Sequence, residues 1–277
     1  MASADASYAD RRRAFRRLHE SGCFVLPNPW DAGSARYLQR LGFKALATTS
    51  AGCAWTNGVS DGAAGLEATL ANVRAIVQAT DLPVNADFES GFAVTAEGVA
   101  SNVAACVAAG VAGLSIEDST GRPEAPLYPL DAAVERLRAA RAAIDATQTG
   151  VMLVGRAECY LAGHPDPLAE SLRRLTAYAE AGADVLFAPG AVTRDDIAAI
   201  VSAVAPRPVN VVIPRNIGLT VADLAALGVR RISVGGTLAR TAWTAFTRAA
   251  QTIADEGTFT GFDDILTGAA VNGFLKR

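Results

Sequence analysis

Short apolar runs that end abruptly in polar residues recur along the chain, and amphipathic segments long enough for helices separate them. The sharpest example is residues 82–92, where an apolar start around Val84 gives way to Asp87 and Glu89. Apolar strand residues belong in a core, whereas a carboxylate is costly to bury unless it is paired or bound to a metal. The pattern therefore predicts strands whose C-terminal ends emerge together at one polar face.

The same pattern predicts a regular alternation of strands and helices. Strands are expected at residues 23–26, 45–49, around Val84, and at 113–117, 151–155, 184–188, 209–213 and 231–234. Helices are expected at residues 6–21, 32–41, 65–80, 95–109, 131–147, 167–181, 193–204, 220–227, 237–256 and 263–274. Gly42, Gly110, Gly182 and Gly228 each fall between a helix and a strand, because glycine takes the left-handed conformation that ends a helix.

Eight strands separated by helices predict a parallel α/β fold, and eight is the number that closes a TIM barrel. We expect a (β/α)8 TIM barrel with an extra N-terminal helix and a C-terminal helical extension, forming a single domain over residues 1–277. A doubly wound open sheet is the alternative, but no G-x-G-x-x-G follows the first strand. The connections at residues 50–64 and 119–130 are longer than usual, which favours a functional role.

The composition of the chain argues against several classes of function and location. Apolar residues make up 51% of the 277 residues, and the net charge of -3 argues against nucleic-acid and anionic-membrane partners. No apolar run is long enough for a membrane span, and the N-terminus lacks the apolar core of a signal peptide. The four cysteines show neither metal-ligand spacing nor a disulfide framework, so a reducing, cytoplasmic location is expected.

Two scarce residue types exclude some chemistries. Lys44 and Lys276 are the only lysines, and neither is placed for a Schiff-base aldolase or a PLP enzyme, which needs a lysine amine in its site. The chain also has only two histidines, which argues against a histidine-centred metal site or catalytic triad.

The candidate chemistry lies at the strand ends, which form the active face of a TIM barrel. Asp87 and Glu117 follow adjacent strands, so their carboxylates can converge, and a hard cation such as Mg²⁺ would relieve their repulsion. Arg156 offers a permanently charged fork for a carboxylate or an enolate oxygen. A structural ion pair among these three residues is the alternative, and Asp118 and Glu158 could likewise be structural or orient their neighbours.

Backbone and polar groups at two other strand ends could hold a substrate. Ser50, with the amides of Ala51 and Gly52 after it, could receive a carboxylate as a backbone nest does. Asn210 is a further polar residue at a strand end, although its strand could continue to Ile213.

These strand-end motifs resemble the isocitrate lyase / phosphoenolpyruvate mutase superfamily over about residues 24–234. The similar pieces are residues 84–87 (VNAD), 113–118 (GLSIED) and 155–158 (GRAE), on strands three, four and five. The resemblance implies a TIM barrel that binds Mg²⁺, or alternatively Mn²⁺, and a small carboxylate substrate. It also implies a homo-oligomer, a dimer or tetramer, whose subunits exchange the C-terminal helix at about 263–274.

The resemblance also implies roles for individual residues. Asp87 and Glu117 would hold the metal directly or through water, and Ser50 and the amides after it would hold the substrate carboxylate. Arg156 would stabilise the enolate, Asn210 would be the polar residue of strand seven, and Asp61 would be the acidic residue of the mobile loop after strand two.

Two departures from the family pattern matter. The family usually has an aspartate, often a metal ligand, where this chain has Asn85, so Asn85 would ligate weakly unless Glu89 compensates. Residues 119–126 also lack the cysteine, histidine and lysine of the lyase loop, and the lysine and asparagine of the phosphonomutase loop.

The sequence therefore predicts a Mg²⁺-dependent lyase that acts on a small 2-oxo or 2-hydroxy carboxylate through an enolpyruvate-like intermediate. Retro-aldol cleavage or decarboxylation is expected, with Asp61 or Glu158 transferring the proton. Phosphonate chemistry on the same scaffold is one alternative, and a non-catalytic barrel that binds 2-oxo acids is another.

Overall fold

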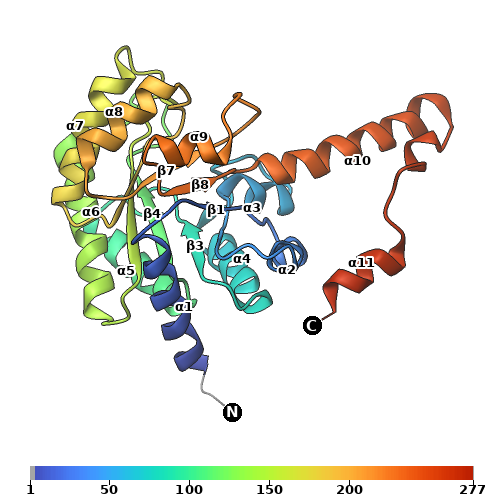
Figure 1. Cartoon of the computed structure of the whole chain (residues 1–277), viewed down its shortest axis with the longest axis horizontal. Helices are drawn as coiled ribbons and strands as arrows, with labels where there is room; N and C mark the ends of the chain where they lie inside the picture. The colour runs from blue at the N-terminus through green and yellow to red at the C-terminus, as the bar shows by residue number, and fades with distance from the viewer. Residues whose placement is uncertain (1–3, 277) are drawn as a thin grey trace.

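The computed structural model describes residues 4–276 and shows strands and helices in alternation (Figure 1). The strands are β1 (Phe24–Leu26), β2 (Leu46–Ala47), β3 (Val84–Asp87), β4 (Gly113–Glu117), β5 (Met152–Arg156), β6 (Val185–Phe187), β7 (Val209–Val212) and β8 (Arg231–Ser233). The helices are α1 (Ala4–Leu18), α2 (Ala32–Arg40), α3 (Ser50–Thr56), α4 (Gly65–Ala79), α5 (Ala96–Ala108), α6 (Leu130–Ala146), α7 (Pro167–Glu180), α8 (Arg194–Val204), α9 (Val221–Ala226), α10 (Thr237–Glu256) and α11 (Gly268–Leu275), with a 3₁₀ turn η1 (Thr260–Phe262).

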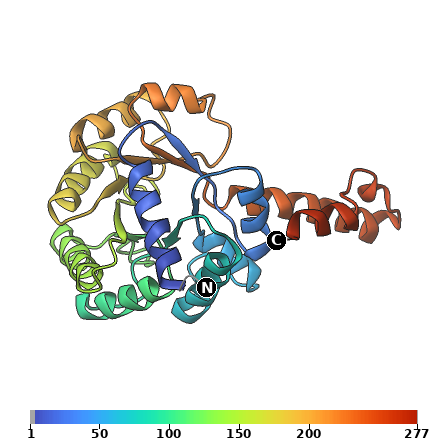
Figure 2. The same cartoon turned by 60° about the horizontal axis from the view of Figure 1, so that its bottom comes forward.

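The strands form one parallel sheet in the order β1-β8-β7-β6-β5-β4-β3-β2. The seam between the two end strands is bridged where the Ala47 N–H donates to the Pro27 carbonyl at 3.1 Å. Helices surround the sheet as an outer ring (Figure 2). The (β/α)8 barrel predicted from the sequence is therefore confirmed, because strands β3 to β8 are each paired in parallel on both sides and the two end strands, β1 and β2, meet at the seam.

Side chains fill the barrel, so its interior is a core rather than a channel. The inward-facing apolar set comprises Leu26, Ala45, Ala47, Ala112, Met152, Val154, Val185 and Phe187, together with Phe15 from α1. Phe15 is fully buried, and α1 lies across the end of the barrel at which the strands begin (Figure 2). The extra N-terminal helix therefore closes this end, and the opposite end, called the mouth here, holds the polar strand ends.

Glycine at position 113 makes room for this closure. A Cβ there would lie 2.7 Å from Oδ1 of Asn85 and 2.9 Å from the Phe15 ring. Any larger residue on this inward face of β4 would therefore displace the ring of Phe15.

Local sequence signals set the helix ends. The Asp31 side chain accepts the Ser34 N–H at 2.7 Å and so caps the N-terminus of α2. Thr95 caps α5 in the same way, and Gly110 follows the end of that helix with φ of 93°. Observed bounds differ from the predicted ones by only a few residues for most elements.

Two segments differ more. The predicted loop at 50–64 begins with a helix, α3, because Thr49 at the end of β2 caps it by accepting the Gly52 N–H. The predicted helix at 263–274 begins later, as α11 with Thr267 as its N-cap, and the turn η1 precedes the predicted range. Close contact explains the turn, since a Cβ on Gly261 would lie 2.8 Å from the Cα of Ala249 in α10.

The C-terminal extension leaves the barrel and then returns to it. Helix α10 projects sideways, and the chain turns back so that α11 lies beside α2 (Figure 1). Arg36 donates to the Leu275 carbonyl at 2.9 Å, and the Tyr37 and Phe274 rings lie 4.7 Å apart. Across the described residues, no helix has both the length and the apolar character of a membrane span.

Candidate active site

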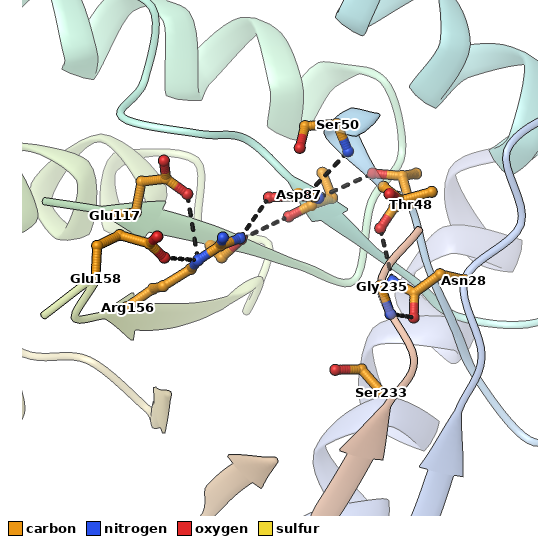
Figure 3. A network of polar contacts seen from close by, with 12 residues as sticks. Asn28, Thr48, Ser50, Asp87, Glu117, Arg156, Glu158, Ser233 and Gly235 are labelled. Atoms are coloured by element: carbon orange, nitrogen blue, oxygen red, sulfur yellow. Dashed lines mark hydrogen bonds and ion pairs between the residues drawn. The ribbon is translucent and has the colours of Figure 1, made fainter. Parts of the chain in front are cut away.

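Three strand ends bring acidic side chains around one arginine at the mouth (Figure 3). Arg156, the last residue of β5, places Nη1 3.2 Å from Oδ1 of Asp87 and Nε 3.2 Å from Oε2 of Glu117. Its Nε also donates to Oε1 of Glu158. The structure therefore brings together Asp87, Glu117, Arg156 and Glu158, as the strand-end pattern predicted.

Asp87 is held from the β2 side as well. Its Oδ2 accepts the Ser50 N–H at 2.9 Å, and its own N–H donates to the Thr48 hydroxyl at 2.9 Å (Figure 3). Sequence reasoning missed Thr48, although it is polar and ends a strand as the other candidates do. Side-chain exposures of 16% for Asp87 and Arg156 and 13% for Glu117 leave the cluster shielded but open at one side.

Burial and crowding shift the protonation of this cluster. Burial raises the pKa of Glu117 well above its usual value; Arg156 opposes that shift, and the Glu158 and Asp87 carboxylates add to it. Burial also raises the pKa of Glu158. Although burial disfavours the charge on Arg156, the carboxylates of Glu117, Glu158 and Asp87 raise the pKa of its guanidinium. Arg156 is therefore a fixed cation.

Glu89 borders the cluster in an unusual backbone conformation. Its φ of 45° lies in the left-handed region, which a non-glycine residue seldom occupies. Burial raises the pKa of Glu89 to about 7, and the charges of Asp87 and Asp61 contribute. Asp61 itself is exposed in the connection after α3, yet it lies near enough for its charge to act on Glu89.

The predicted carboxylate nest is partly used by the protein itself. The Ser50 N–H donates to Asp87, and the Gly52 N–H donates to the Thr49 hydroxyl at 3.3 Å. Gly52 is also pressed against Trp30, since a Cβ would lie 2.7 Å from the Cβ of that residue. The side chain of Ser50 and the amide of Ala51 are therefore the groups of the predicted nest that these two hydrogen bonds leave unused.

Two predicted site residues lie deeper in the barrel. Asn85 and Asn210 are 2% and 1% exposed, and the carbonyl oxygen of each side chain accepts a hydrogen bond from Arg231. Asn210 also donates to the Ser233 hydroxyl at 3.0 Å. Asn85 precedes Asp87 by two residues, so it faces the same way one layer lower. The structure does not bring Asn85 or Asn210 to the acidic cluster.

No sequence pattern pointed to this buried arginine. Arg231 begins β8 and is 3% exposed, and burial lowers the pKa of its guanidinium to about 9. Although Arg231 begins an apolar strand, its side chain fills the barrel between two amides.

The backbone just before α10 is hydrogen-bonded to the end of β1. Oδ1 of Asn28 accepts the N–H groups of both Val234 and Gly235 at 2.9 Å, and the Asn28 amide donates to the Thr48 carbonyl (Figure 3). Asn28 therefore ties the end of β1 to the ends of β2 and β8 beside the acidic cluster. The sequence signal for Asn28 was its place just after the first strand.

A hairpin formed by residues 118–129, called the β4–α6 hairpin here, borders the other side of the cluster. Ser119 and Leu127 pair as an isolated antiparallel bridge, and the Thr120 N–H donates to the Pro126 carbonyl at 2.9 Å. A cavity of about 250 Å³ lies between this hairpin, including Ser119 and Arg122, and the segment that carries Glu158 and Leu161. This cavity gives a small organic acid room beside Glu158.

The residues at the mouth fit a divalent cation. No three His, Cys, Asp or Glu side chains in the described part of the chain are already arranged to hold a metal. Mg²⁺ does not require that, since it keeps several waters and usually takes one or two protein carboxylates. Asp87, Glu89, Glu117 and Glu158 face one guanidinium, which leaves three negative charges uncompensated when all four are ionised. A hard cation would offset that excess.

Comparisons with known proteins agree with this geometry. A family model described as phosphoenolpyruvate phosphomutase matches residues 15–254. A solved structure from Burkholderia cenocepacia J2315, provisionally described as a lyase or mutase, is 47% identical with a TM-score of 0.93, covering 97% of each chain. An uncharacterised Mycobacterium tuberculosis H37Rv protein is 34% identical over 87% of this chain and 89% of its own.

Relatives with named activities include lyases, decarboxylases, a mutase and an oxaloacetate acetylhydrolase. The 2-methylisocitrate lyase of Escherichia coli K12 is 33% identical over 59% of this chain and 56% of its own length. Other matches are described as oxaloacetate decarboxylase, 2,3-dimethylmalate lyase and phosphoenolpyruvate phosphomutase. From the strand-end cluster, the barrel and the match over most of its length, we conclude that this chain belongs to the isocitrate lyase / phosphoenolpyruvate mutase superfamily.

Proposed function

We propose that the protein is a Mg²⁺-dependent lyase that cleaves a C–C bond in a small 2-oxo or 2-hydroxy carboxylate. The reaction would be a retro-aldol cleavage or a decarboxylation through an enolpyruvate-like intermediate. The observation that carries the proposal is the single guanidinium of Arg156 among the carboxylates of Asp87, Glu117 and Glu158 at the open end of the barrel.

Asp87 and Glu117 are the residues that would hold the metal, directly or through water, with Glu89 beside them. Bound Mg²⁺ would supply a Lewis acid that polarises the α-oxygen of the substrate. Asn85 is left out of this set because its oxygen accepts from Arg231 one layer below. Mn²⁺, which also accepts oxygen ligands, would be expected to substitute.

Arg156 would stabilise the negative charge that develops on the enolate oxygen. Its cation is present at all physiological pH values because the surrounding carboxylates raise its pKa. The Ser50 side chain and the Ala51 amide would orient the substrate carboxylate. Glu158 or Asp61 would transfer the proton, since Glu158 contacts Arg156 and Asp61 lies near enough for its charge to act on Glu89.

Phosphonate chemistry remains the second candidate, because the matching family model is that of phosphoenolpyruvate phosphomutase. For both candidates, the β4–α6 hairpin lacks loop residues that the family pattern would supply. From Ser119 to Pro129 it contains no cysteine, histidine or lysine, so neither reaction would draw a proton donor of these three types from this segment.

A substrate panel would separate the candidates. Purified protein with Mg²⁺ is incubated with oxaloacetate, 2,3-dialkylmalates, 2-methylisocitrate and phosphonopyruvate, and products are followed by NMR, with EDTA as the control. Lyase activity predicts EDTA-sensitive release of pyruvate or a 2-oxo acid from one of the first three. Tight oxalate binding by calorimetry without turnover of any compound would instead indicate a binding protein, and turnover of phosphonopyruvate alone would indicate phosphonate chemistry.

We further propose that the protein is a cytoplasmic homo-oligomer. Its four cysteines are free, as in a reducing compartment, and α10 exposes Trp243 and Phe246 on an arm that projects from the barrel. Exchange of the C-terminal segment between subunits would cover these side chains.

A further inference from the structure

A buried carboxylate lies directly behind the acidic cluster and is not part of it. Asp118 follows Glu117 on the chain, so its side chain points away from the barrel interior, and it is 2% exposed. Its Oδ1 accepts the Glu158 N–H at 2.8 Å, while its Oδ2 accepts from Arg174 at 2.9 Å and from the Tyr178 hydroxyl at 2.5 Å. Three donors satisfy its two oxygens, so a ligand at the mouth cannot reach it.

Helix α7 supplies the other half of this arrangement. Glu170, Arg174 and Tyr178 are spaced four residues apart and so share one face of the helix. Arg174 donates from Nε to Glu170 at 2.6 Å and from Nη1 to Asp118. Gly155 lets this face approach β5 closely, because a Cβ there would lie 3.0 Å from the Cβ of Tyr178.

Asp118 and Arg174 also hold the base of the β4–α6 hairpin. The Tyr128 N–H donates to the Asp118 carbonyl at 2.9 Å, and Arg174 donates to the Tyr128 carbonyl at 3.0 Å. The guanidinium of Arg136 stacks over the Tyr128 ring at 4.3 Å and donates to the Ser90 carbonyl just after Glu89. Asp118 is therefore the point at which the hairpin and the Glu158 segment meet.

Burying an ion pair seldom stabilises a fold more than apolar residues of similar volume would. The Asp118–Arg174 pair instead fixes the direction of the chain as it leaves β5. The Glu158 N–H is held from behind, and the Glu158 carboxylate then meets Nε of Arg156 in front. Small displacements of groups around a reacting centre are costly to the rate, even when they begin outside the site.

We propose that Asp118, held by Arg174 and Tyr178, is a positioning residue that sets Glu158 against Arg156 and fixes the β4–α6 hairpin beside them. Its effect on catalysis rests on the proposed function, whereas its effect on the order of the hairpin does not. Asp118 should thus act on the rate through Glu158, without touching substrate or metal.

Asp184 offers a matched control at the opposite end of the barrel. Its Oδ2 accepts the Leu153 N–H at 2.8 Å and pairs with Arg141 at 3.1 Å, so it too joins a strand N–H to an arginine. The test compares Asp118→Asn and Tyr178→Phe with Asp184→Asn. Tyr178→Phe removes one hydroxyl and keeps the ring, so it remains informative if Asp118→Asn folds poorly.

Four measurements are made on each full-length variant: melting temperature, steady-state kinetics, oxalate binding in Mg²⁺ by calorimetry, and amide hydrogen exchange at Thr120 and Tyr128. For Asp118→Asn we expect kcat to fall at least about tenfold while oxalate affinity changes less than about threefold. Tyr178→Phe should show a smaller fall of the same kind, and both should speed exchange in the hairpin. Asp184→Asn should lower the melting temperature without lowering kcat and without speeding hydrogen exchange in the hairpin.

The proposal is overturned if kcat follows melting temperature equally in the Asp118 and Asp184 variants, or if Asp118→Asn leaves kcat unchanged. If the wild-type protein turns over no substrate, the proposed function fails but the hydrogen-exchange comparison still decides this inference. Unchanged exchange at Thr120 and Tyr128 in both the Asp118 and Tyr178 variants would then refute it.

Discussion

Nη1 of Arg156 lies 3.2 Å from Oδ1 of Asp87, so the two residues join the end of β5 to the end of β3 across the mouth of the barrel. The same Asp87 carboxylate accepts the Ser50 N–H through its other oxygen. Asp87 therefore connects the fixed cation to the segment after β2, and any ligand that binds between them must exchange with one of these contacts.

Replacing Asp87 tests the metal site. Asp87→Asn removes the charge and keeps one oxygen, which can accept from Ser50 or from Arg156 but not from both as they now lie, and we expect the fold to persist. Mg²⁺ affinity should fall about tenfold or more, with loss of metal-dependent turnover. Calorimetric titration of Mg²⁺ and circular dichroism would measure both effects. Asp81→Asn, at an exposed residue that pairs with Arg11, is the control, and equal Mg²⁺ affinity in the two variants would contradict the assignment.

Glu89 should make stability depend on pH. Its folded pKa is about 7, above the ordinary value of 4.5, so the folded chain holds a proton that the unfolded chain releases. Stability contributed by the protonated form is full below about pH 4.5 and is lost as pH rises through 7. Glu89→Gln should therefore be more stable than wild type at pH 8, by about 1 kcal/mol after allowance for solvent screening, and equal to it near pH 4.

Urea denaturation at pH 4.5 and pH 8 without metal would measure this difference, with the exposed Glu135→Gln on α6 as the control. Saturating Mg²⁺ should reduce the gain at pH 8, because a cation offsets the charge that the substitution removes. A Glu89→Gln variant whose stability follows that of wild type at both pH values would show that this carboxyl is not perturbed.

Phe15 should matter for stability and not for the chemistry. Its ring is fully buried at the closed end of the barrel, so Phe15→Ala should lower the free energy of unfolding by about 3–5 kcal/mol. Leu41→Ala removes a side chain that is 57% exposed and should change it by less than about 0.5 kcal/mol. Thermal and urea unfolding would compare the two, and a loss of similar size in both would mean that α1 does not close the barrel in solution.

The exposed aromatic side chains of α10 predict the oligomeric state. Trp243 and Phe246 are 45% and 60% exposed, and their rings contact each other at 5.4 Å. We expect the wild-type protein to sediment as a dimer or tetramer and the double variant Trp243→Ser/Phe246→Ser to shift to a smaller species. Val94→Ser, at an apolar side chain that is 89% exposed elsewhere, is the control. A monomeric wild-type protein would refute the proposed exchange of the C-terminal segment.

The sequence alone determined the barrel and the residues at its mouth. Apolar runs separated by helices predict parallel strands, and the carboxyl ends of such strands meet at one face wherever the sheet closes. That argument is local to each strand, which is why it found Asp87, Glu117 and Arg156. It also could have found Thr48 and Asn28, which end strands in the same way.

Only the tertiary structure decided how deep each polar residue lies and what it meets there. Asn85 and Asp87 face the same way on β3, but Arg231 reaches Asn85 from β8, and no local pattern states which distant strand fills that layer. Asp118 is held behind the mouth by Arg174, 56 residues further along the chain. Depth and partnership depend on the register between strands and on the side chains that other elements insert, and those are properties of the closed barrel.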